Sequence, residues 1–391
     1  MKSDPIRIVF VGLYDEENLG DPIITYCTEW LYRKVITHHE ITSSYLYLDY
    51  IEKTWHKKLI YKVVNKLEQA FWGYDKAQEI LSNKLLFRTQ TYFEQGIQGA
   101  DMVVVVGGGL VKYSYQFFYF ELMALLRAGE KLDVPIILNA VGVEGYDVNN
   151  ARCQLLKKML QMPSLIYVST RDDLETLIHG YFNNNPSIPV GKVADPAVWA
   201  KEAFGVDCKT DRNVIGLGVA REGIFQDYGI DFSPTQLKDL YFSIIRKLLQ
   251  QGCQVEIFTN GLSADNILAK ELWNELRKVN LSVVLRLPLN PRHLVEIISC
   301  YKGVIATRLH ACIIAYSMNV PAVGLVWNNK LTLFGKNINR EENFVTIANF
   351  NAPYIICQLN KAIQDGYDIK VRSSFRQTIL DSIHNVAQLK L

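Results

Sequence analysis

Arg308 and His310 are the residues of this sequence best suited to chemistry on an anion, because they follow a predicted strand directly. The apolar run over residues 303–307 predicts that strand, and the apolar residues after His310 predict a helix. The first N–H groups of a helix favour an anion, and the arginine guanidinium matches a carboxylate or phosphate. Histidine can deliver a proton near neutral pH. The pattern predicts an anion site; the alternative is a helix-start arginine beside a locally satisfied histidine.

Two further cations follow strands of the same half of the chain. Arg221 comes after the apolar run at residues 214–219, and Lys330 comes after the run at residues 322–326. In open α/β sheets, ligands bind beyond the carboxyl ends of the strands. We therefore expect Arg221, Arg308 and Lys330 to lie at one edge of one sheet.

The first predicted strand, residues 6–12, leads into a loop that contains Asn18, Gly20 and Asp21. Gly20 permits a tight turn, and the helix predicted to start at Pro22 offers N–H groups to an anion. Asp21 is a candidate base, or a group that orients a hydroxyl; the alternative is that it only caps that helix. The loop lacks the GxGxxG spacing of a dinucleotide site.

Two other strand ends in the first half carry weaker signals. The run at residues 102–106 is followed by three glycines and then by a helical pattern. These glycines, Gly107, Gly108 and Gly109, either let the backbone approach a ligand closely or form a simple strand-to-helix turn. Arg171 and Asp172 follow the predicted strand at residues 165–169. Arg171 is either a substrate contact or half of a structural ion pair at a helix start.

These side chains require a scaffold of short Val- and Ile-rich strands that alternate with helices, which predicts doubly wound α/β layers. Further predicted strands cover residues 44–50, 136–141, 255–259 and 283–287. Ser233-Pro234 and Asn290-Pro291 are typical helix starts. Residues 196–212 show no periodicity and predict a domain junction. We expect an N-terminal domain over residues 1–200, a C-terminal domain over 201–372 and a final helix over 373–391, starting at Ser373 and packing back on the N-terminal domain.

The amino-acid composition argues against a nucleic-acid-binding, zinc-binding or membrane-spanning protein. The 391 residues include 42 Lys+Arg and 40 Asp+Glu, so bulk charge does not favour nucleic-acid binding. Seven scattered cysteines show no zinc spacing and, being odd in number, no disulfide framework, which favours a reducing cytoplasm. The N-terminus reads as a strand and its loop, not as a signal peptide, and no apolar run reaches the length of about 18 residues that a membrane helix needs.

One segment departs from the α/β pattern. It carries six lysines among aromatic and aliphatic residues: Lys53, Lys57, Lys58, Lys62, Lys66 and Lys76. Two interpretations stay open. The segment forms a basic amphipathic helix that lies on the inner membrane face, or it forms an ordinary surface helix whose lysines are solvated.

Taken in order, the motifs resemble the polysaccharide pyruvyl transferase family. The matching pieces span roughly residues 8 to 335: Asn18-Leu-Gly20-Asp21, Asp101 with Gly107-Gly108-Gly109, Ser169-Thr-Arg171-Asp172, Asp195-Pro196, Arg308-Leu309-His310-Ala311, and Pro321 followed by Lys330. Arg-Leu-His-Ala is the most specific piece. Residues 50–98 match no motif of the family.

The resemblance implies two Rossmann-like domains that face each other across a cleft, similar to GT-B glycosyltransferases. It also implies transfer of a pyruvyl group from phosphoenolpyruvate to two hydroxyls of a sugar as a ketal, in bacterial surface polysaccharide biosynthesis. No metal or cofactor is implied beyond the co-substrate phosphoenolpyruvate. The acceptor stays open between a nucleotide sugar, a lipid-linked oligosaccharide and a finished polymer.

The resemblance associates the Arg-Leu-His motif and Arg221 with donor binding. On that basis His310 is the expected general acid or phosphate partner, while Arg308, Arg221 and Lys330 hold the donor, and Asp21 is the candidate base toward the acceptor. Two other functions remain open: a GT-B glycosyltransferase that uses a nucleotide sugar, and a non-catalytic sugar- or anion-binding protein.

Overall fold

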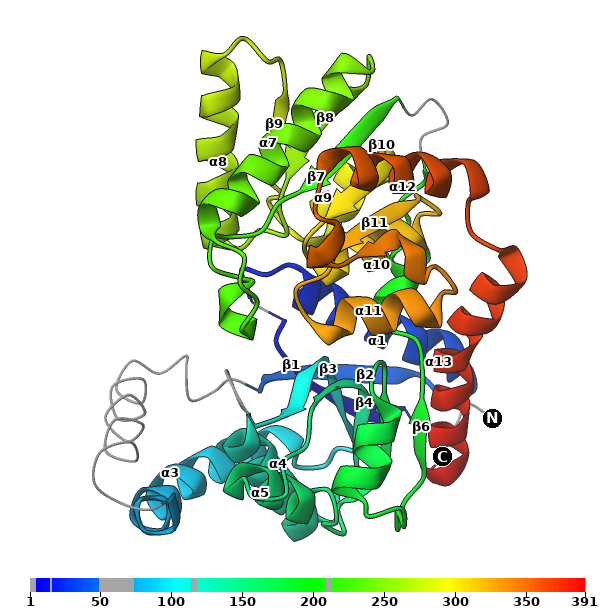
Figure 1. Ribbon diagram of the computed structural model, residues 1–391. Coiled ribbons are helices and arrows are strands. Elements are labelled where there is room, and N and C mark those ends of the chain that lie inside the picture. Colours follow the sequence, from blue (N-terminus) through cyan, green and yellow to red (C-terminus); the bar gives the residue numbers. More distant parts are fainter. Residues whose placement is uncertain (1–4, 15, 49–73, 114–117, 209–212, 391) are drawn as a thin grey trace. The chain divides into compact units, whose positions relative to one another are not determined.

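The computed structural model describes residues 5–14, 16–48, 74–113, 118–208 and 213–390 (Figure 1). The chain forms two compact units. Unit 1 comprises Met1–Tyr14, Thr28–Val193 and Ile379–Leu391, and unit 2 comprises Asp15–Cys27 and Ala194–Thr378. The loop after the first strand therefore belongs to unit 2, although the strand itself belongs to unit 1.

Unit 1 is built on a six-stranded parallel sheet with the order β2-β1-β3-β4-β5-β6. Its strands have the following bounds: β1 Ile6–Gly12, β2 Ile41–Tyr47, β3 Met102–Lys112, β4 Ile136–Glu144, β5 Leu165–Thr170 and β6 Val190–Lys192. The central strands are apolar on both faces because helices cover both sides. The strand order reverses at β1, because β2 is added on one side of it and β3 on the other, so the switch point of this sheet lies between β1 and β3.

Helices cover both faces of the unit 1 sheet. One face carries α3 (Tyr74–Ile97), α4 (Tyr119–Leu132) and α5 (Ala151–Met159), whose apolar residues share a core with alternate residues of β1, β3 and β4. The other face receives parts of α1 (Gly20–Val35) and α13 (Ile369–Lys390). Tyr32 of α1 packs edge-on against Phe10, and Ser382 of α13 donates a hydrogen bond to Tyr167. A π-helical turn, η1 (Thr176–Tyr181), follows β5.

Unit 2 contains a second six-stranded parallel sheet, with the order β12-β11-β10-β7-β8-β9. Its strands have the following bounds: β7 Val214–Gly218, β8 Gln254–Phe258, β9 Val284–Arg286, β10 Tyr301–Ala306, β11 Ala322–Leu325 and β12 Phe344–Val345. Counted from β7, this is the 3-2-1-4-5-6 order of the Rossmann fold. The strand order reverses at β7, because β8 is added on one side of it and β10 on the other, so the switch point lies beside the strand that precedes Arg308.

The helices of unit 2 pack on both faces of this sheet (Figure 1). One face carries α7 (Pro234–Gln250), α8 (Ser263–Lys278) and α12 (Ala352–Asp365), which share one core with β7 and β8. The other face carries α9 (Pro291–Ser299) and α10 (Leu309–Ser317), while α11 (Asn329–Asn337) follows β11. Both predicted helix starts are confirmed: Ser233 forms a complete capping box with Gln236, and Asn290 caps α9 ahead of Pro291.

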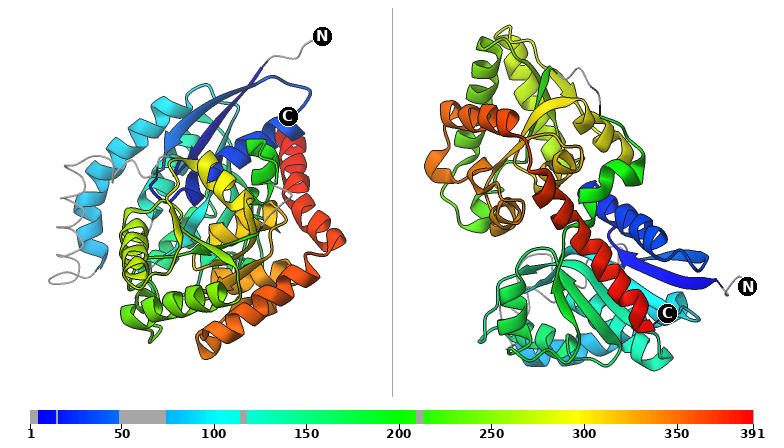
Figure 2. Two further views of the ribbon diagram at one scale, coloured as in Figure 1. Left: turned by 90° about the horizontal axis from the view of Figure 1, so that it is seen from above. Right: turned by 90° about the vertical axis from the view of Figure 1, so that its right-hand side faces the viewer.

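Several boundaries differ from those predicted. The strand predicted at residues 44–50 begins earlier, at Ile41, because its register is set by pairing with β1. The segment 196–212, expected to be irregular, contains η2 (Pro196–Trp199) and α6 (Ala200–Phe204) within its described part. The final helix begins at Ile369, not at Ser373, and Figure 2 shows α13 as one long helix. Strands β6 and β12 were not predicted, because each is too short to show a pattern.

The basic amphipathic segment, residues 53–76, lies almost wholly outside the described residues, so neither interpretation of it is tested. Among the residues that the structure describes, no helix is long and apolar enough to cross a membrane.

Candidate active site

The predicted cations of unit 2 lie where three parallel strands end. Arg308 follows β10 and Arg221 follows β7, and these two strands are hydrogen-bonded neighbours at the switch point. Lys330 lies in the first turn of α11, directly after β11, which pairs with β10 on its other side. All three therefore belong to the carboxyl edge of one sheet, where open α/β folds bind ligands.

Arg308 is held by a buried carboxylate, that of Asp265 in the first turn of α8. Its Nε donates to Asp265 Oδ2 at 2.8 Å, and its Nη2 donates to Oδ1 at 2.6 Å. The Asp265 side chain is fully buried, whereas that of Arg308 is 15% exposed. The pair uses one edge of the guanidinium, and among the described residues no hydrogen bond engages Nη1. The second edge, Nη1 with Nη2, is thus available for a carboxylate or phosphate.

His310 lies in the first turn of α10, almost completely buried. Its Nε2 is 3.7 Å from Oδ2 of Asp195, so the two groups form an ion pair only when the imidazole is protonated. On another side the ring lies directly against Gly20: a Cβ atom at that position would come within 2.2 Å of Nδ1. Gly20 is therefore needed for close packing against the imidazole, not only for a tight turn.

The loop that carries Gly20 is anchored within unit 2 by the residues after β8. The N–H of Leu19 donates to the carbonyl of Asn260 at 2.8 Å, and the N–H of Ser263 donates to Glu17 at 3.0 Å. This hydrogen bond from Ser263 lowers the pKa of Glu17. Gly261 has a φ of +97°, and a Cβ atom there would meet the Glu17 carbonyl at 2.6 Å. The anchoring brings residues near position 20 to a histidine near position 310.

Asn18 and Asp21 lie on this anchored loop. Asn18 Nδ2 donates to Asp21 Oδ2 at 3.1 Å. Helix α1 begins at Gly20, two residues before Pro22, so Asp21 sits in its first turn and is not the N-cap that one interpretation predicted. Within the described residues, the buried Oδ1 of Asn18 and Nδ2 of Asn260 have no hydrogen-bond partner.

Arg221 and Lys330 are less well oriented toward a ligand than Arg308. Arg221 Nη2 forms an ion pair with Asp227, Nη1 donates to the Glu222 carbonyl at 3.0 Å, and the side chain is 35% exposed. An anion must therefore share or replace Asp227 to use this guanidinium fully. Lys330 is half-buried at the start of α11.

A buried tyrosine ties the two strand ends of the switch point together. The Tyr241 hydroxyl of α7 accepts from the N–H of Ala220 at 3.1 Å and lies 2.7 Å from the Thr307 hydroxyl. Burial raises the pKa of Tyr241 to about 12, so the phenol stays neutral at physiological pH. This neutral link stabilises the backbone immediately before Arg221 and Arg308.

The weaker candidates lie in unit 1, and the glycines are placed differently from the prediction. Gly107, Gly108 and Gly109 lie inside β3, which continues to Lys112, so the strand does not end there. Gly108 has a φ of +135°, and the pairing with β4 is irregular beyond it. The cause is packing: the glycine backbone lies beside Gly142, where a Cβ atom would be 3.1 Å from both Asp172 Oδ2 and the Gly108 carbonyl.

Arg171 is buried at the end of β5, and its backbone N–H donates to Val141. Its neighbour Asp172 is also buried, and Oδ1 accepts from the N–H groups of Val143 and Asp173, both at 2.8 Å. Among the described residues, Oδ2 of Asp172 has no hydrogen-bond partner. The sequence did not single out this carboxylate as a site residue.

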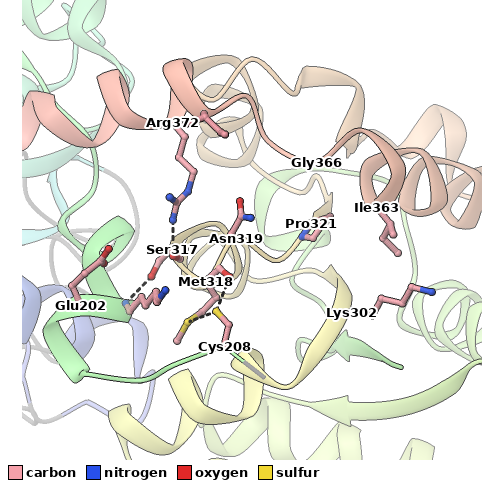
Figure 3. A pocket seen from close by; sticks show the side chains of 12 residues that line it. Glu202, Cys208, Lys302, Ser317, Met318, Asn319, Pro321, Ile363, Gly366 and Arg372 are labelled. Carbon is pink, nitrogen blue, oxygen red and sulfur yellow. Dashed lines mark hydrogen bonds between the residues drawn. The ribbon is translucent and has the colours of Figure 1, made fainter. Parts of the chain in front are cut away.

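A separate pocket of about 750 Å³ lies elsewhere in unit 2 (Figure 3). It opens near the amino ends of β10 and β11, beside Lys302 and Pro321, and is closed by the end of α10 at Ser317 and by Arg372. Arg372 donates to the Ser317 carbonyl at 2.7 Å. None of the predicted site residues is among those that line it, so the pocket does not belong to the candidate site.

Three residues of the site were missed by the sequence reasoning as functional positions: Asp265, Asp195 and Asn260. Asn260 lies two residues after the end of β8, and Asp265 lies in the first turn of the helix that follows, so the strand-end rule could have identified both. Asp195 was part of a family motif but had no role assigned to it. No group of His, Cys, Asp and Glu in the described part of the chain could hold a metal ion.

Two Rossmann-like sheets flanked by helices define a protein with GT-B-like architecture. Solved structures share it: UDP-GlcNAc 2-epimerase from Methanocaldococcus jannaschii has a TM-score of 0.57 at 12% identity, with 99% of each chain covered. The Neisseria meningitidis enzyme bound to UDP-GlcNAc has 0.56 at 13% identity, with 99% of each covered. A glycosyltransferase from Rickettsia africae has 0.50 at 11%, covering 98% of this chain and 97% of that one.

The family model for polysaccharide pyruvyl transferase matches residues 18–329, and the chain belongs to this family. No curated protein matches the chain. The match begins at Asn18 and ends at Asn329, so it includes Gly20, Arg308 and His310 but stops one residue before Lys330.

Proposed function

We propose that this protein transfers the pyruvyl group of phosphoenolpyruvate to two hydroxyls of one sugar, as a ketal, in the synthesis of a bacterial surface polysaccharide. The observation that carries the proposal is the geometry of Arg308. Its guanidinium is held by Asp265 along one edge, while the other edge stays available beside the start of α10 and His310. Family membership supplies the reaction class.

The chemical demands of the donor fit this site. Phosphoenolpyruvate carries a carboxylate and a phosphate, which as a phosphomonoester bears about −1.5 to −2 charges at pH 7. One anionic group would bind the second edge of Arg308, aided by the N–H groups at the start of α10. The other would bind Arg221 or Lys330, at the ends of the strands on either side of β10.

The reaction balances with one proton donated and two accepted. His310 gives a proton to the methylene carbon of the donor, which makes C2 electrophilic. A sugar hydroxyl adds to C2 and loses its proton, and the C2–O bond to phosphate breaks. The second hydroxyl then adds to C2 and loses its proton. Of the two protons released by the hydroxyls, one restores the imidazolium of His310 and the other leaves with the phosphate. The products are the pyruvyl ketal and hydrogen phosphate.

We assign supporting roles in these proton transfers to two carboxylates. Asp195 lies 3.7 Å from His310 Nε2 and would be the ion-pair partner of the imidazolium in the first step. Asp21 lies on the loop whose Gly20 contacts the same ring, and it is our candidate base for an acceptor hydroxyl. A base here needs no metal ion to work.

Mass spectrometry of candidate acceptors incubated with phosphoenolpyruvate tests the proposal. The acceptors should include nucleotide sugars, lipid-linked oligosaccharides and polymer. One of them should gain a pyruvyl ketal, and one equivalent of phosphate should be released for each ketal formed. Phosphate release without pyruvyl addition to an acceptor, or no phosphate release with any acceptor, would contradict the proposal.

Thermal shift separates this function from a nucleotide-sugar glycosyltransferase with a similar fold. A ligand present at 100 times its Kd stabilises a protein by about 2.7 kcal/mol, so saturating phosphoenolpyruvate should raise the Tm by several degrees. Nucleotide diphosphates and UDP-sugars should not, unless one of them is the acceptor. Stabilisation by UDP alone, with no effect of phosphoenolpyruvate, would favour the glycosyltransferase.

A further inference from the structure

We propose that Asp265 is the positioning residue for donor binding: it turns the Arg308 guanidinium so that one defined edge meets the anionic donor. This inference rests on the proposed function, because it names the residue that orients the donor site. Asp265 has no contact with the donor in this scheme, and it acts through Arg308.

The geometry leaves Arg308 one orientation. Nε and Nη2 are the two nitrogens on the side edge of the guanidinium, and each donates to a different oxygen of Asp265, at 2.8 and 2.6 Å. This fork-to-fork arrangement fixes the plane as well as the direction of the group. Because the side edge is occupied, the end edge formed by Nη1 and Nη2 must face the ligand, and it too has the spacing for a two-oxygen anion.

Burial makes the pair rigid. Asp265 is fully buried, and a carboxylate without donors in that position would be strongly destabilised. Arg308 therefore cannot leave Asp265 to follow a ligand at low free-energy cost. An exposed arginine would lose side-chain freedom on binding, whereas this one has already lost it on folding.

Asp265 also contacts the second donor-binding candidate through the backbone. Its Oδ1 accepts from the N–H of Arg221 at 2.8 Å. One carboxylate thus holds the side chain that follows β10 and the main chain that follows β7. These are the two neighbouring strands of the switch point, so Asp265 sets the spacing between the two cations.

Two substitutions test this role, with kcat, the KM for phosphoenolpyruvate and Tm measured for each. Asp265→Asn removes one acceptor oxygen and the charge. Asp265→Glu keeps the charge but moves the carboxylate by one methylene, so it tests position alone and serves if the asparagine variant does not fold. We expect either change to raise the KM about 10- to 100-fold, because a charge-assisted contact to the donor is misdirected.

The matched control is Glu256→Gln. Glu256 is a buried carboxylate of β8 that pairs with Arg286 Nε at 2.6 Å in the same unit, and among the described residues no hydrogen bond joins it to Arg308, Arg221 or Asp265. This substitution should lower Tm without changing the KM for phosphoenolpyruvate by more than about twofold, the effect of a distant site.

A double-substitution cycle separates positioning from general stability. In an Arg308→Lys background there is no fork to orient, so Asp265→Glu should raise the KM less than about threefold. A merely structural Asp265 would give the same KM increase in both backgrounds, and that result overturns the inference. So does a KM unchanged by both Asp265 substitutions in a wild-type enzyme that uses phosphoenolpyruvate. If the wild-type enzyme neither binds nor uses phosphoenolpyruvate, the proposed function fails first and the inference fails with it.

Discussion

The carboxyl edges of the two sheets are built in opposite ways. In unit 2 the edge is made of charged side chains that are paired and oriented, with Arg308 on Asp265 and His310 near Asp195. In unit 1 the irregular features are in the backbone, inside two strands that lead to that edge. Ala140 has a φ of +53° inside β4, and Gly108 has a φ of +135° inside β3.

Buried polar atoms without partners do not follow this division. Among the described residues they include Asp172 Oδ2 and Asn139 Nδ2 of unit 1 as well as Asn18 Oδ1 and Asn260 Nδ2 of unit 2, although buried polar groups are nearly always hydrogen-bonded. What distinguishes the unit 2 edge is Asp265, which accepts three hydrogen bonds and orients a cation. The two units of this protein therefore differ: paired side chains characterise the carboxyl edge of the unit 2 sheet, whereas irregular backbone characterises β3 and β4 of unit 1.

The largest effect is expected from Arg308→Ala. Loss of two charge-assisted hydrogen bonds, at about 1.5–3 kcal/mol each, should lower kcat/KM by about 10²- to 10⁴-fold. The substitution also leaves Asp265 buried and unpaired, which costs about 3–5 kcal/mol of stability.

A second variant separates the loss of activity from the loss of stability. Replacing both Arg308 and Asp265 by leucine removes the pair together, which is often neutral for stability. Steady-state kinetics and thermal melts should show an inactive protein with nearly normal Tm. Activity retained by the leucine pair would show that the paired edge of unit 2 is scaffold only.

His310→Gln should mainly affect turnover. Removing a general acid lowers kcat by about 10²- to 10⁴-fold, while glutamine keeps most hydrogen-bonding capacity, so the KM for phosphoenolpyruvate should change little. Solvent-exchange measurements at the methyl carbon of the product would show whether protonation has become limiting. Equal loss in kcat and in donor affinity would instead make His310 a binding group.

Gly20→Ala tests whether the loop from the first strand controls the histidine. Its new methyl would come within 2.2 Å of His310 Nδ1, so the ring must shift. A displacement of about 1 Å can cost about 100-fold in rate, and we expect a fall in kcat of that order with Tm lowered only slightly. Gly191→Ala serves as the control for the substitution type, because Gly191 is not in the left-handed region and the nearest atom to its Cβ position, the Tyr167 hydroxyl oxygen, lies at an ordinary contact distance of 3.6 Å. Unchanged kcat in Gly20→Ala would separate the loop from the reaction.

The smallest effect is expected from substitution of Ala140, the residue with a left-handed backbone inside β4 of unit 1. Ala140 in the left-handed region costs about 1–2 kcal/mol, which Ala140→Gly relieves. Ala322→Gly in β11 has no such strain to relieve. The free energy of unfolding should therefore fall less for Ala140→Gly than for Ala322→Gly, by about 1–2 kcal/mol. Equal losses in urea titrations would argue against stored strain in β4.

Local features were predictable because their causes are local. The capping box at Ser233, the start of α9 at Asn290 and the strand Ile6–Gly12 all agree with the sequence interpretation. A cap, a proline at the first helical position and an apolar run each act within a few residues. The α/β class and the family follow from such features taken in order.

The ends of strands and helices were harder to predict where pairing or packing with another element sets them. Strand β3 runs through three glycines that predict a stop, because β4 pairs with it and Gly142 leaves room for Asp172. Similarly, Asp21 has the sequence signature of a cap, yet α1 begins before it. In both cases a contact distant in sequence overrides the local preference.

What the sequence by itself determined is the set of residue types at the strand ends, with Arg308 and His310 at the start of a helix. Only the tertiary structure decided how those groups point: Asp265 lies 43 residues from Arg308, and Gly20 lies nearly 300 from His310. The first pairing arises because parallel strands of one sheet bring their carboxyl ends to one edge whatever the length of chain between them. The second arises because the loop after β1 is hydrogen-bonded to residues after β8 and so belongs to unit 2. Periodicity and capping act within a few residues, so they carry no information about which residues distant in sequence will meet.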